Sequence, residues 1–344
     1  MKTLCHILLT GPSGIVGLEI IRQLASNKNV ALTVFDRKTP SAVKLLSPYK
    51  KRISIIYGDI SNADDLKQIP SNLHAVIHLA TIMSPFADER PDLAYQVNVD
   101  GTYKLIKQLE KNSPNTFFLY SSSVQVYGDR IHLPNIRVSD SLIPSEGDEY
   151  AYTKIEAEAL IQQCELDWSI FRLTTIMKNH KISKLMFHMP LDTIMEICSP
   201  EDAALAFINA IEKRVELSGN IFNLGGGERC RITYRDFLEK TFRLFGLGEL
   251  DFPRNTFAER NYHCGIYADG DKLEEILYFR KDNLDSYFDK VKRSVPAIKV
   301  FFTSLFQKEI KRSLLKQSEP YRAFNEKNRM MLKHFFGEPD LQGV

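Results

Sequence analysis

The sequence lacks the features that mark membrane-spanning, secreted and zinc-binding chains. No apolar run reaches the roughly 18 residues that a membrane-spanning helix needs, and the N-terminal segment has one Lys and only a short apolar run before its first glycines, unlike a signal peptide. The five cysteines are odd in number and never spaced as CxxC, which argues against a disulfide framework and a zinc site. We therefore expect a cytoplasmic protein with reduced thiols and no bound metal.

The sequence also lacks an excess of charge of either sign, because its 344 residues contain 45 Lys and Arg and 43 Asp and Glu. A balance this close gives no overall field that would favour nucleic acid, so we expect no nucleic-acid partner. The charge is unevenly spread, however, since residues 285–344 hold 12 Lys and Arg against 7 Asp and Glu. The basic surplus therefore belongs to the C-terminal segment.

Apolar runs of strand length alternate with segments of helical period through the first half of the chain, which predicts βαβ units and a parallel sheet. The runs are rich in Val, Ile, Leu and Phe without alternation, as expected for strands covered by helices on both faces. We expect strands at about 4–9, 30–35, 53–57, 75–79, 116–120 and 168–173, and helices at about 15–26, 62–68, 92–111 and 150–165. This pattern predicts an α/β fold built on a Rossmann-type doubly wound sheet.

The pattern loosens after residue 174. Ser199 followed by Pro200 predicts a helix start, with the helix ending near residue 213; a strand at 220–224 and a helix at 233–245 follow. We divide the chain into a first domain built on the parallel sheet (1–174), a smaller lobe with some elements returning to the first domain (175–283), and a helical C-terminal extension (284–344).

A glycine-rich turn joins the first expected strand to the first expected helix. Thr10-Gly11-Pro12-Ser13-Gly14-Ile15-Val16-Gly17 places glycines where the backbone must approach a pyrophosphate and where a helix N-terminus offers N–H donors. The spacing is GxxGxxG and differs from the general GxGxxG fingerprint. Its position between strand and helix favours a dinucleotide site over a simple tight turn.

Asp36 ends the second expected strand, where a carboxylate accepts the ribose hydroxyls of NAD and repels the 2′-phosphate of NADP. Arg37 follows it, and a guanidinium there could instead pair with that 2′-phosphate. We favour NAD and keep NADP as the alternative. Asp59, after the third strand, could contact the adenine amino group or cap the helix that begins near Asn62.

Tyr150 and Lys154 form a YxxxK pair, whose spacing places the phenol and the ammonium on one helix face. A free phenol has a pKa of about 10, so it is a poor base near neutral pH unless a nearby cation stabilises the phenolate. The helix follows a strand that ends in Ser121-Ser122-Ser123, at the sheet edge where open α/β sheets bind their ligands.

These features together resemble the extended short-chain dehydrogenase/reductases, the NAD-dependent epimerase/dehydratase family, over residues 4–245. The motifs that carry the resemblance are TGxxGxxG at 10–17, Asp36, Asp59, the stretches 78–80 and 98–102, the serine-rich strand end with Val126-Tyr127-Gly128, and YxxxK. The resemblance implies that Tyr150 is the acid/base, Lys154 its partner, and Ser123 the hydroxyl that binds the substrate oxygen. His78 and Asn98 are expected to brace the strand ends.

The resemblance also implies which residues contact the cofactor. The expected set is Thr10, Gly11, Ser13, Gly14, Ile15, Gly17, Asp36, Arg37, Asp59, Ile60, Leu79, Ala80, Asn98, Ser122, Tyr150 and Lys154.

The sequence departs from its relatives at the substrate positions. Val124 and Gln125 stand where dehydratases carry the Asp-Glu pair for water elimination, and Thr175 stands where epimerases have a substrate-contacting Asn. Met195 replaces the Arg that grips a diphosphate, which disfavours a nucleotide sugar. The stretch 184–192, with its Met, Phe and His188, could line an apolar substrate site or pack the small lobe.

Three functions stay open. The first is an NAD(P)-dependent oxidoreductase that acts on a secondary alcohol or ketone of a small substrate; the second is a sugar or sugar-nucleotide epimerase with tightly bound NAD; the third is a dinucleotide-sensing binding protein. The Phe-rich extension could pack on the substrate lobe, pair two subunits as a homodimer, or rest on an anionic membrane. We favour packing and do not expect membrane contact.

Overall fold

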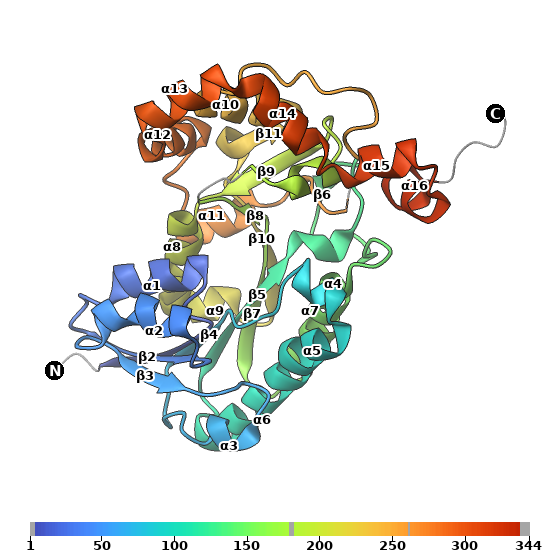
Figure 1. Cartoon of the computed structure of the whole chain (residues 1–344). Helices are drawn as coiled ribbons and strands as arrows, with labels where there is room; N and C mark the ends of the chain where they lie inside the picture. The colour runs from blue at the N-terminus through green and yellow to red at the C-terminus, as the bar shows by residue number, and fades with distance from the viewer. Residues whose placement is uncertain (1–3, 179–181, 261, 338–344) are drawn as a thin grey trace.

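The computed structural model describes residues 4–178, 182–260 and 262–337, and its largest element is a seven-stranded sheet (Figure 1). Every neighbouring pair of strands in it is parallel. From edge to edge the strands are β3 (Ser54–Tyr57), β2 (Val30–Asp36), β1 (Cys5–Thr10), β4 (Ala75–His78), β5 (Phe117–Ser123), β7 (Asp167–Leu173) and β10 (Asn220–Leu224). The strand order reverses between β1 and β4, which makes this the Rossmann-type sheet that the sequence predicts.

Helices cover both faces of this sheet. Helices α1 (Ile15–Leu24), α2 (Pro40–Leu46), α8 (Pro200–Ala210) and α11 (Asp271–Leu277) contribute to the apolar core on one face. Helices α3 (Ala63–Leu66), α5 (Pro91–Tyr95), α6 (Gly101–Asn112) and α7 (Glu149–Gln162) contribute to the core on the other. Within β1, Leu8 and Leu9 are both fully buried but belong to opposite cores, which explains why the strands show no polar alternation.

The helices expected in the first half are present, with some differences. The helix expected at 92–111 is interrupted by one turn of π-helix at Gln96–Asp100, between α5 and α6. Helix α2, which Thr39 caps through a hydrogen bond from the Ala42 N–H, was not expected from the sequence. Ser199 caps α8 as expected, with Pro200 in its first turn.

A smaller lobe stands over the carboxyl ends of the large sheet. Its sheet contains β8 (Thr175–Ile176), β9 (Ile194–Cys198) and β11 (Arg231–Thr233), and α10 (Tyr234–Phe245) follows directly. A short pair, β6 (Asn135–Ile136) and β12 (Ile266–Tyr267), lies beside it. Met195, at the position of the expected diphosphate-binding Arg, is buried in the core of this lobe. The remaining short helices are α4 (Phe86–Glu89) and α9 (Arg214–Leu217).

The described part of the C-terminal extension, residues 284–337, forms five helices that run across the small lobe (Figure 1). They are α12 (Leu284–Ser294), α13 (Ala297–Leu305), α14 (Gln307–Leu315), α15 (Glu319–Asn325) and α16 (Arg329–Phe336). Tyr287 of α12 and Leu314 of α14 are buried in the small-lobe core, with the Tyr287 ring stacked on Phe237 of α10 at 5.8 Å. In the described part of the chain, no helix combines the length and apolar character needed to cross a bilayer.

Candidate active site

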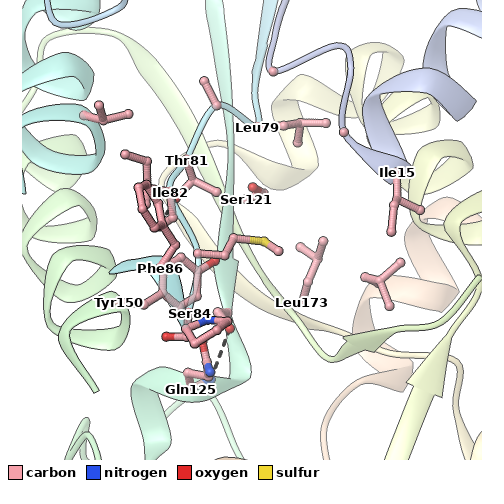
Figure 2. A pocket seen from close by; sticks show the side chains of 18 of the residues that line it. Ile15, Leu79, Thr81, Ile82, Ser84, Phe86, Ser121, Gln125, Tyr150 and Leu173 are labelled. Atoms are coloured by element: carbon pink, nitrogen blue, oxygen red, sulfur yellow. Dashed lines mark hydrogen bonds between the residues drawn. The ribbon is translucent and has the colours of Figure 1, made fainter. Parts of the chain in front are cut away.

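One large cavity, of about 1240 Å³, extends from the glycine-rich turn after β1 to the small lobe. It follows the carboxyl ends of the parallel strands, where open α/β sheets bind their ligands. The volume exceeds what a single drug-sized molecule fills, so it has room for a dinucleotide and a small second molecule. Figure 2 shows Ile82, Phe86 and Tyr150 on one wall, with Ile15 and Leu173 across the space from them.

The turn between β1 and α1 requires glycine for steric reasons. Gly11 has a φ of +67°, and a Cβ there would lie 2.7 Å from the Ala80 backbone nitrogen. A Cβ on Gly17 would lie 2.5 Å from the Gly11 carbonyl oxygen. The backbone of this turn is therefore packed closely against the end of β4, and α1 starts directly beside the cavity with its first N–H groups available to an anion.

The carboxylate of Asp36 connects β2 to the glycine-rich turn. Its Oδ2 accepts a hydrogen bond from the Ser13 N–H at 3.2 Å, and its Oδ1 accepts one from the Arg37 N–H at 2.8 Å. Asp59 does not cap α3, because Asn62 accepts the hydrogen bond from the Asp64 N–H instead. Asp59 accepts hydrogen bonds from the backbone and hydroxyl of Ser61, and it lines the cavity.

Tyr150 lies in the first turn of α7, with its hydroxyl hydrogen-bonded to Ser123 and Thr81. Burial and the neighbouring Asp148 carboxylate raise the pKa of Tyr150 well above its usual value of 10, whereas those two hydrogen bonds act to lower it. Three elements hold this hydroxyl group cluster: the end of β5, the loop after β4, and α7. The arrangement presents a proton donor and acceptor to the cavity.

Lys154 lies one turn further along α7 and is 1% exposed. Its Nζ donates hydrogen bonds to the Ser121 carbonyl at 2.8 Å and the Tyr120 hydroxyl at 3.2 Å, and it lies 5.5 Å from the centre of the Tyr150 ring. Burial lowers the pKa of Lys154 to about 7. The ammonium and the phenol therefore share one helix face, as their spacing predicts.

A buried hydrogen-bond chain supports the cavity wall from behind. Thr10 Oγ1 lies 2.6 Å from His78 Nδ1, and His78 Nε2 lies 2.9 Å from Thr102 Oγ1. Asn98, in the π-helical turn, accepts a hydrogen bond from the Ile82 N–H at 2.7 Å and donates one to Thr153 at 2.9 Å. Burial lowers the pKa of His78 to about 3, so this row of hydrogen-bonded side chains is uncharged at neutral pH.

Most of the expected site residues line the cavity. These are Gly11, Ser13, Gly14, Ile15, Gly17, Asp36, Arg37, Asp59, Ile60, Leu79, Ala80, Ser122, Ser123, Tyr150, Thr175 and His188. Thr10, Asn98 and Lys154 do not, because each is almost fully buried behind the wall, where its side chain binds neighbouring strand ends or loops. For Thr10 and Asn98 the structure thus shows a bracing role.

The stretch 184–192 divides between the two roles considered for it. Met186 and Phe187 are buried in the core of the small lobe, whereas Leu185, His188 and Met189 line the cavity. The Glu319 carboxylate of α15 lies 3.1 Å from His188 Nε2 and 2.8 Å from Lys184 Nζ. The C-terminal extension is therefore attached to the cavity wall at this point.

Several cavity residues were not expected from the sequence. They include the loop residues Thr81–Pro85 after β4, Phe86, Asp88 and Glu89 of α4, and Tyr262, His263, Glu319 and His334. The loop after β4 could have been found, because it follows a strand next to the switch point. No sequence pattern marks Tyr262 and His263, which reach the cavity only because the small lobe folds back over β5, with Gln125 Nε2 lying 3.1 Å from His263 Nδ1.

Positive charge is confined to one end of this cavity. Among the described residues that line it, Arg37 is the one Lys or Arg, and it stands beside Asp36 at the cofactor end. The three histidines at the far end, His188, His263 and His334, all have pKa values lowered by burial, that of His263 to about 4. The described residues also contain no cluster of three or more side chains suited to a metal ion.

Comparison with curated proteins finds relatives with several activities. The chain is 26% identical over 329 residues to D-erythronate dehydrogenase of Cupriavidus necator, an alignment that covers 80% of this chain and 98% of that protein. It is 31% identical over 154 residues to the sterol-4-alpha-carboxylate 3-dehydrogenase erg26 of Schizosaccharomyces pombe, covering 44% and 43% of the two chains.

Solved structures share the fold at low sequence identity. The 4,6-dehydratase DesIV of Streptomyces venezuelae, solved with NAD and TYD bound, superposes with a TM-score of 0.69 at 19% identity over 84% of this chain and 96% of that one. UDP-glucose 4-epimerase of Thermotoga maritima gives 0.68 at 17% identity over 87% and 99%. The model of the NAD dependent epimerase/dehydratase family matches residues 7–225. With this match, the Rossmann sheet and the resemblance of its motifs, the chain belongs to the NAD-dependent epimerase/dehydratase family of the extended short-chain dehydrogenase/reductases.

Proposed function

We propose that this enzyme is an NAD-dependent dehydrogenase that interconverts a secondary alcohol and a ketone on a small substrate without negative charge. The observation that carries the proposal is the distribution of charge in the cavity. The hydroxyl cluster of Tyr150 and Ser123 opens toward a substrate end whose described lining residues include no Lys or Arg.

The residues at the other end of the cavity fit NAD. The Ser122 Oγ atom is buried against the cavity and has no hydrogen-bond partner among the described residues, as expected of a group reserved for a ligand. The closely packed glycine turn leaves the first N–H groups of α1 for a pyrophosphate, and Asp36 stands where it would accept the ribose hydroxyls. NAD bound there would supply the carbon that accepts or returns the hydride.

Side chains of this protein would hold the substrate oxygen and transfer the proton. In the oxidation direction Ser123 would hold the substrate oxygen while Tyr150 takes the alcohol proton; in the reverse direction Tyr150 returns it. The hydrogen bonds from Ser123 and Thr81 favour the phenolate. Lys154, when protonated, would favour it further from its place on the same helix face.

The substrate end favours an uncharged or cationic molecule. Asp88, Glu89 and Glu319 line it, and the histidines beside them are held neutral by burial. A nucleoside diphosphate or a sugar acid would therefore meet no fixed positive charge from the described lining. Met83, Phe86, Leu185 and Met189 supply apolar surface for the carbon skeleton of the substrate.

Val124 and Gln125 argue against a dehydratase. They occupy the two positions after Ser123, and neither side chain can act as the acid or base of an elimination. Gln125 lines the cavity beside His263, where it can donate or accept a hydrogen bond without charge. We therefore expect oxidation and reduction to be the complete reaction.

Turnover with a charge-graded substrate panel tests this function. The purified protein would be given NAD with uncharged secondary alcohols, amino alcohols, sugar acids and nucleotide sugars, with NADH formation followed by absorbance and Tyr150→Phe as the control. We expect NADH only with the uncharged or cationic alcohols. Inversion of a nucleotide sugar by protein that retains NAD through gel filtration would instead establish an epimerase, and preferred oxidation of sugar acids would refute the proposed substrate class.

A further inference from the structure

Helix α13 presents its apolar face to solvent. Ile298, Phe301, Phe302 and Leu305 follow the i, i+3, i+4, i+7 spacing that places side chains on one helix face, and each is between 52% and 64% exposed. Phe306, directly after the helix, is 51% exposed. In a soluble helix such a stripe normally faces the core, so its outward orientation requires an explanation.

The opposite side of α13 rests on the small lobe. A Cβ on Gly246, the residue that ends α10, would lie 2.5 Å from the Val300 carbonyl oxygen and 3.3 Å from the Ser304 backbone nitrogen. The glycine thus lets the backbone of α13 approach the end of α10 closely. This contact fixes the orientation of α13, which lies at the outer edge of the molecule in Figure 1. The exposed side chains of Phe301 and Phe302 are left on the side away from the small lobe.

Positively charged residues flank this apolar stripe along the chain. Residues 290–316 contain eight Lys and Arg but only one Asp or Glu. Lys292 and Arg293 at the end of α12, Lys299 within α13 and Lys308 at the start of α14 are all exposed. An apolar helix face bordered by exposed cations on both sides matches the profile of a bilayer interface that contains anionic headgroups.

We propose that α13 docks this enzyme on an anionic phospholipid surface. Ile298, Phe301, Phe302, Leu305 and Phe306 enter the boundary between headgroups and acyl chains, while the flanking Lys and Arg bind lipid phosphates. The contact is peripheral, because the helix has only nine residues and lies in the plane of the interface. This inference does not depend on the proposed dehydrogenase activity.

A second copy of the chain is a poorer occupant of this face. The five partly exposed side chains offer roughly 600 Å², taking about 200 Å² for a large apolar side chain, which is below the ~800 Å² per partner of a stable interface. A two-fold contact would also bring the same exposed lysines of both copies together around the apolar centre, where like charges repel.

The sequence favours packing of the extension on the small lobe over membrane contact, and the proposal adds membrane docking to that packing. That expectation holds for Tyr287 and Leu314, which are buried, and for Phe335 of α16. For α13 it covers only the backbone side, which rests on the end of α10, whereas none of the residues of this helix is buried. The aromatic residues of α13 have the same helical spacing as core residues, so only the position of Gly246 under the helix reveals which face is turned outward.

Vesicle flotation of the full-length protein tests the docking. Wild-type protein would be mixed with phosphatidylcholine vesicles and with phosphatidylcholine–phosphatidylglycerol vesicles. We expect flotation with the second kind, loss of flotation at high salt, and a partition coefficient about tenfold or more lower for the Phe301→Ser/Phe302→Ser variant. Lys292→Gln/Lys299→Gln/Lys308→Gln should weaken binding to the anionic vesicles alone. Val215→Ser, at an apolar residue that is 91% exposed elsewhere, serves as the matched control.

Two results would overturn the proposal. One is wild-type protein that does not float with anionic vesicles, or a double Phe variant that binds them as well as wild type does. The other is a wild-type dimer, seen by light scattering, that the double Phe variant converts to a monomer while vesicles bind neither protein. Because turnover is measured separately, failure of the docking leaves the proposed dehydrogenase untouched, and the reverse also holds.

Discussion

Asp36 and Ser13 are joined by a hydrogen bond of 3.2 Å from the Ser13 N–H to Asp36 Oδ2, which ties the end of β2 to the glycine-rich turn after β1. A single carboxylate thus fixes the turn that would hold the pyrophosphate, and the same carboxylate would accept the hydroxyls of the adenosine ribose. A 2′-phosphate at this position would face that negative charge.

Replacement of Asp36 by Ala should therefore weaken NAD more than NADP. We expect the Kd for NAD to rise about 10- to 100-fold, the loss of a hydrogen bond to a charged group, and the Kd for NADP to change less. Fluorescence or calorimetric titration of both nucleotides measures this, with Arg37→Ala as the companion variant. A larger loss for NADP than for NAD in Asp36→Ala would mean that Arg37 determines the cofactor.

Tyr150→Phe should abolish turnover while leaving NAD affinity nearly unchanged. Only the transferable proton is lost, because the ring still fills its place at the start of α7, and general acid–base catalysis contributes about 10²- to 10⁴-fold. Steady-state turnover and NAD titration of the same preparation separate the two effects. Near wild-type turnover in this variant would show that another group carries the proton.

The buried carboxyl group of Asp148 should make the free energy of unfolding depend on pH. Its Oδ1 caps α7 by accepting a hydrogen bond from the Ala151 N–H at 2.9 Å, whereas its Oδ2 is buried without a hydrogen-bond partner among the described residues. Burial raises the pKa of Asp148 from 3.8 to about 7. The folded state therefore keeps a proton that the unfolded state loses, so the free energy of unfolding should fall as pH rises from about 4 to about 7.

Asp148→Asn should remove this slope, since asparagine keeps the cap but does not titrate. Urea unfolding at a series of pH values compares the two proteins. The same variant also removes a negative charge that raises the pKa of Tyr150, so the rise of kcat with pH should move to lower pH. Parallel unfolding curves for wild type and variant across this range would contradict the assignment.

Arg172 and Glu158 form an ion pair of 2.6 Å in the core, with side chains that are only 4% and 1% exposed. The guanidinium also donates a hydrogen bond to the Tyr127 hydroxyl, which donates one to Asn223, so the pair connects α7, β7 and β10. Glu158→Ala should lower the free energy of unfolding by about 3–5 kcal/mol, because it leaves a buried cation unpaired.

Glu216→Ala, which breaks an exposed pair with Lys213, is the control and should change stability little. An equally small change in the free energy of unfolding in both variants, measured by urea unfolding, would show that the buried pair is not needed for stability.

The sequence by itself determined the Rossmann half of the molecule. Strand-length apolar runs, the GxxGxxG turn and the Ser199 cap are local patterns, and each acts through residues close in the chain, which is why their elements occur close to the predicted places. The same holds for Tyr150 and Lys154, whose helical spacing alone puts them on one face. Lys154 nevertheless lies behind the wall, because its neighbours on β5 decide its depth.

Only the tertiary structure decided what surrounds the substrate end of the cavity and which face of the extension is exposed. Tyr262, His263, Glu319 and His334 come from segments distant in sequence, and no periodicity indicates where a returning loop will stop. The aromatic stripe of α13 is indistinguishable in sequence from a core stripe. Its outward direction follows from the close contact between Gly246 and the Val300 backbone, a long-range steric relationship that local patterns do not encode.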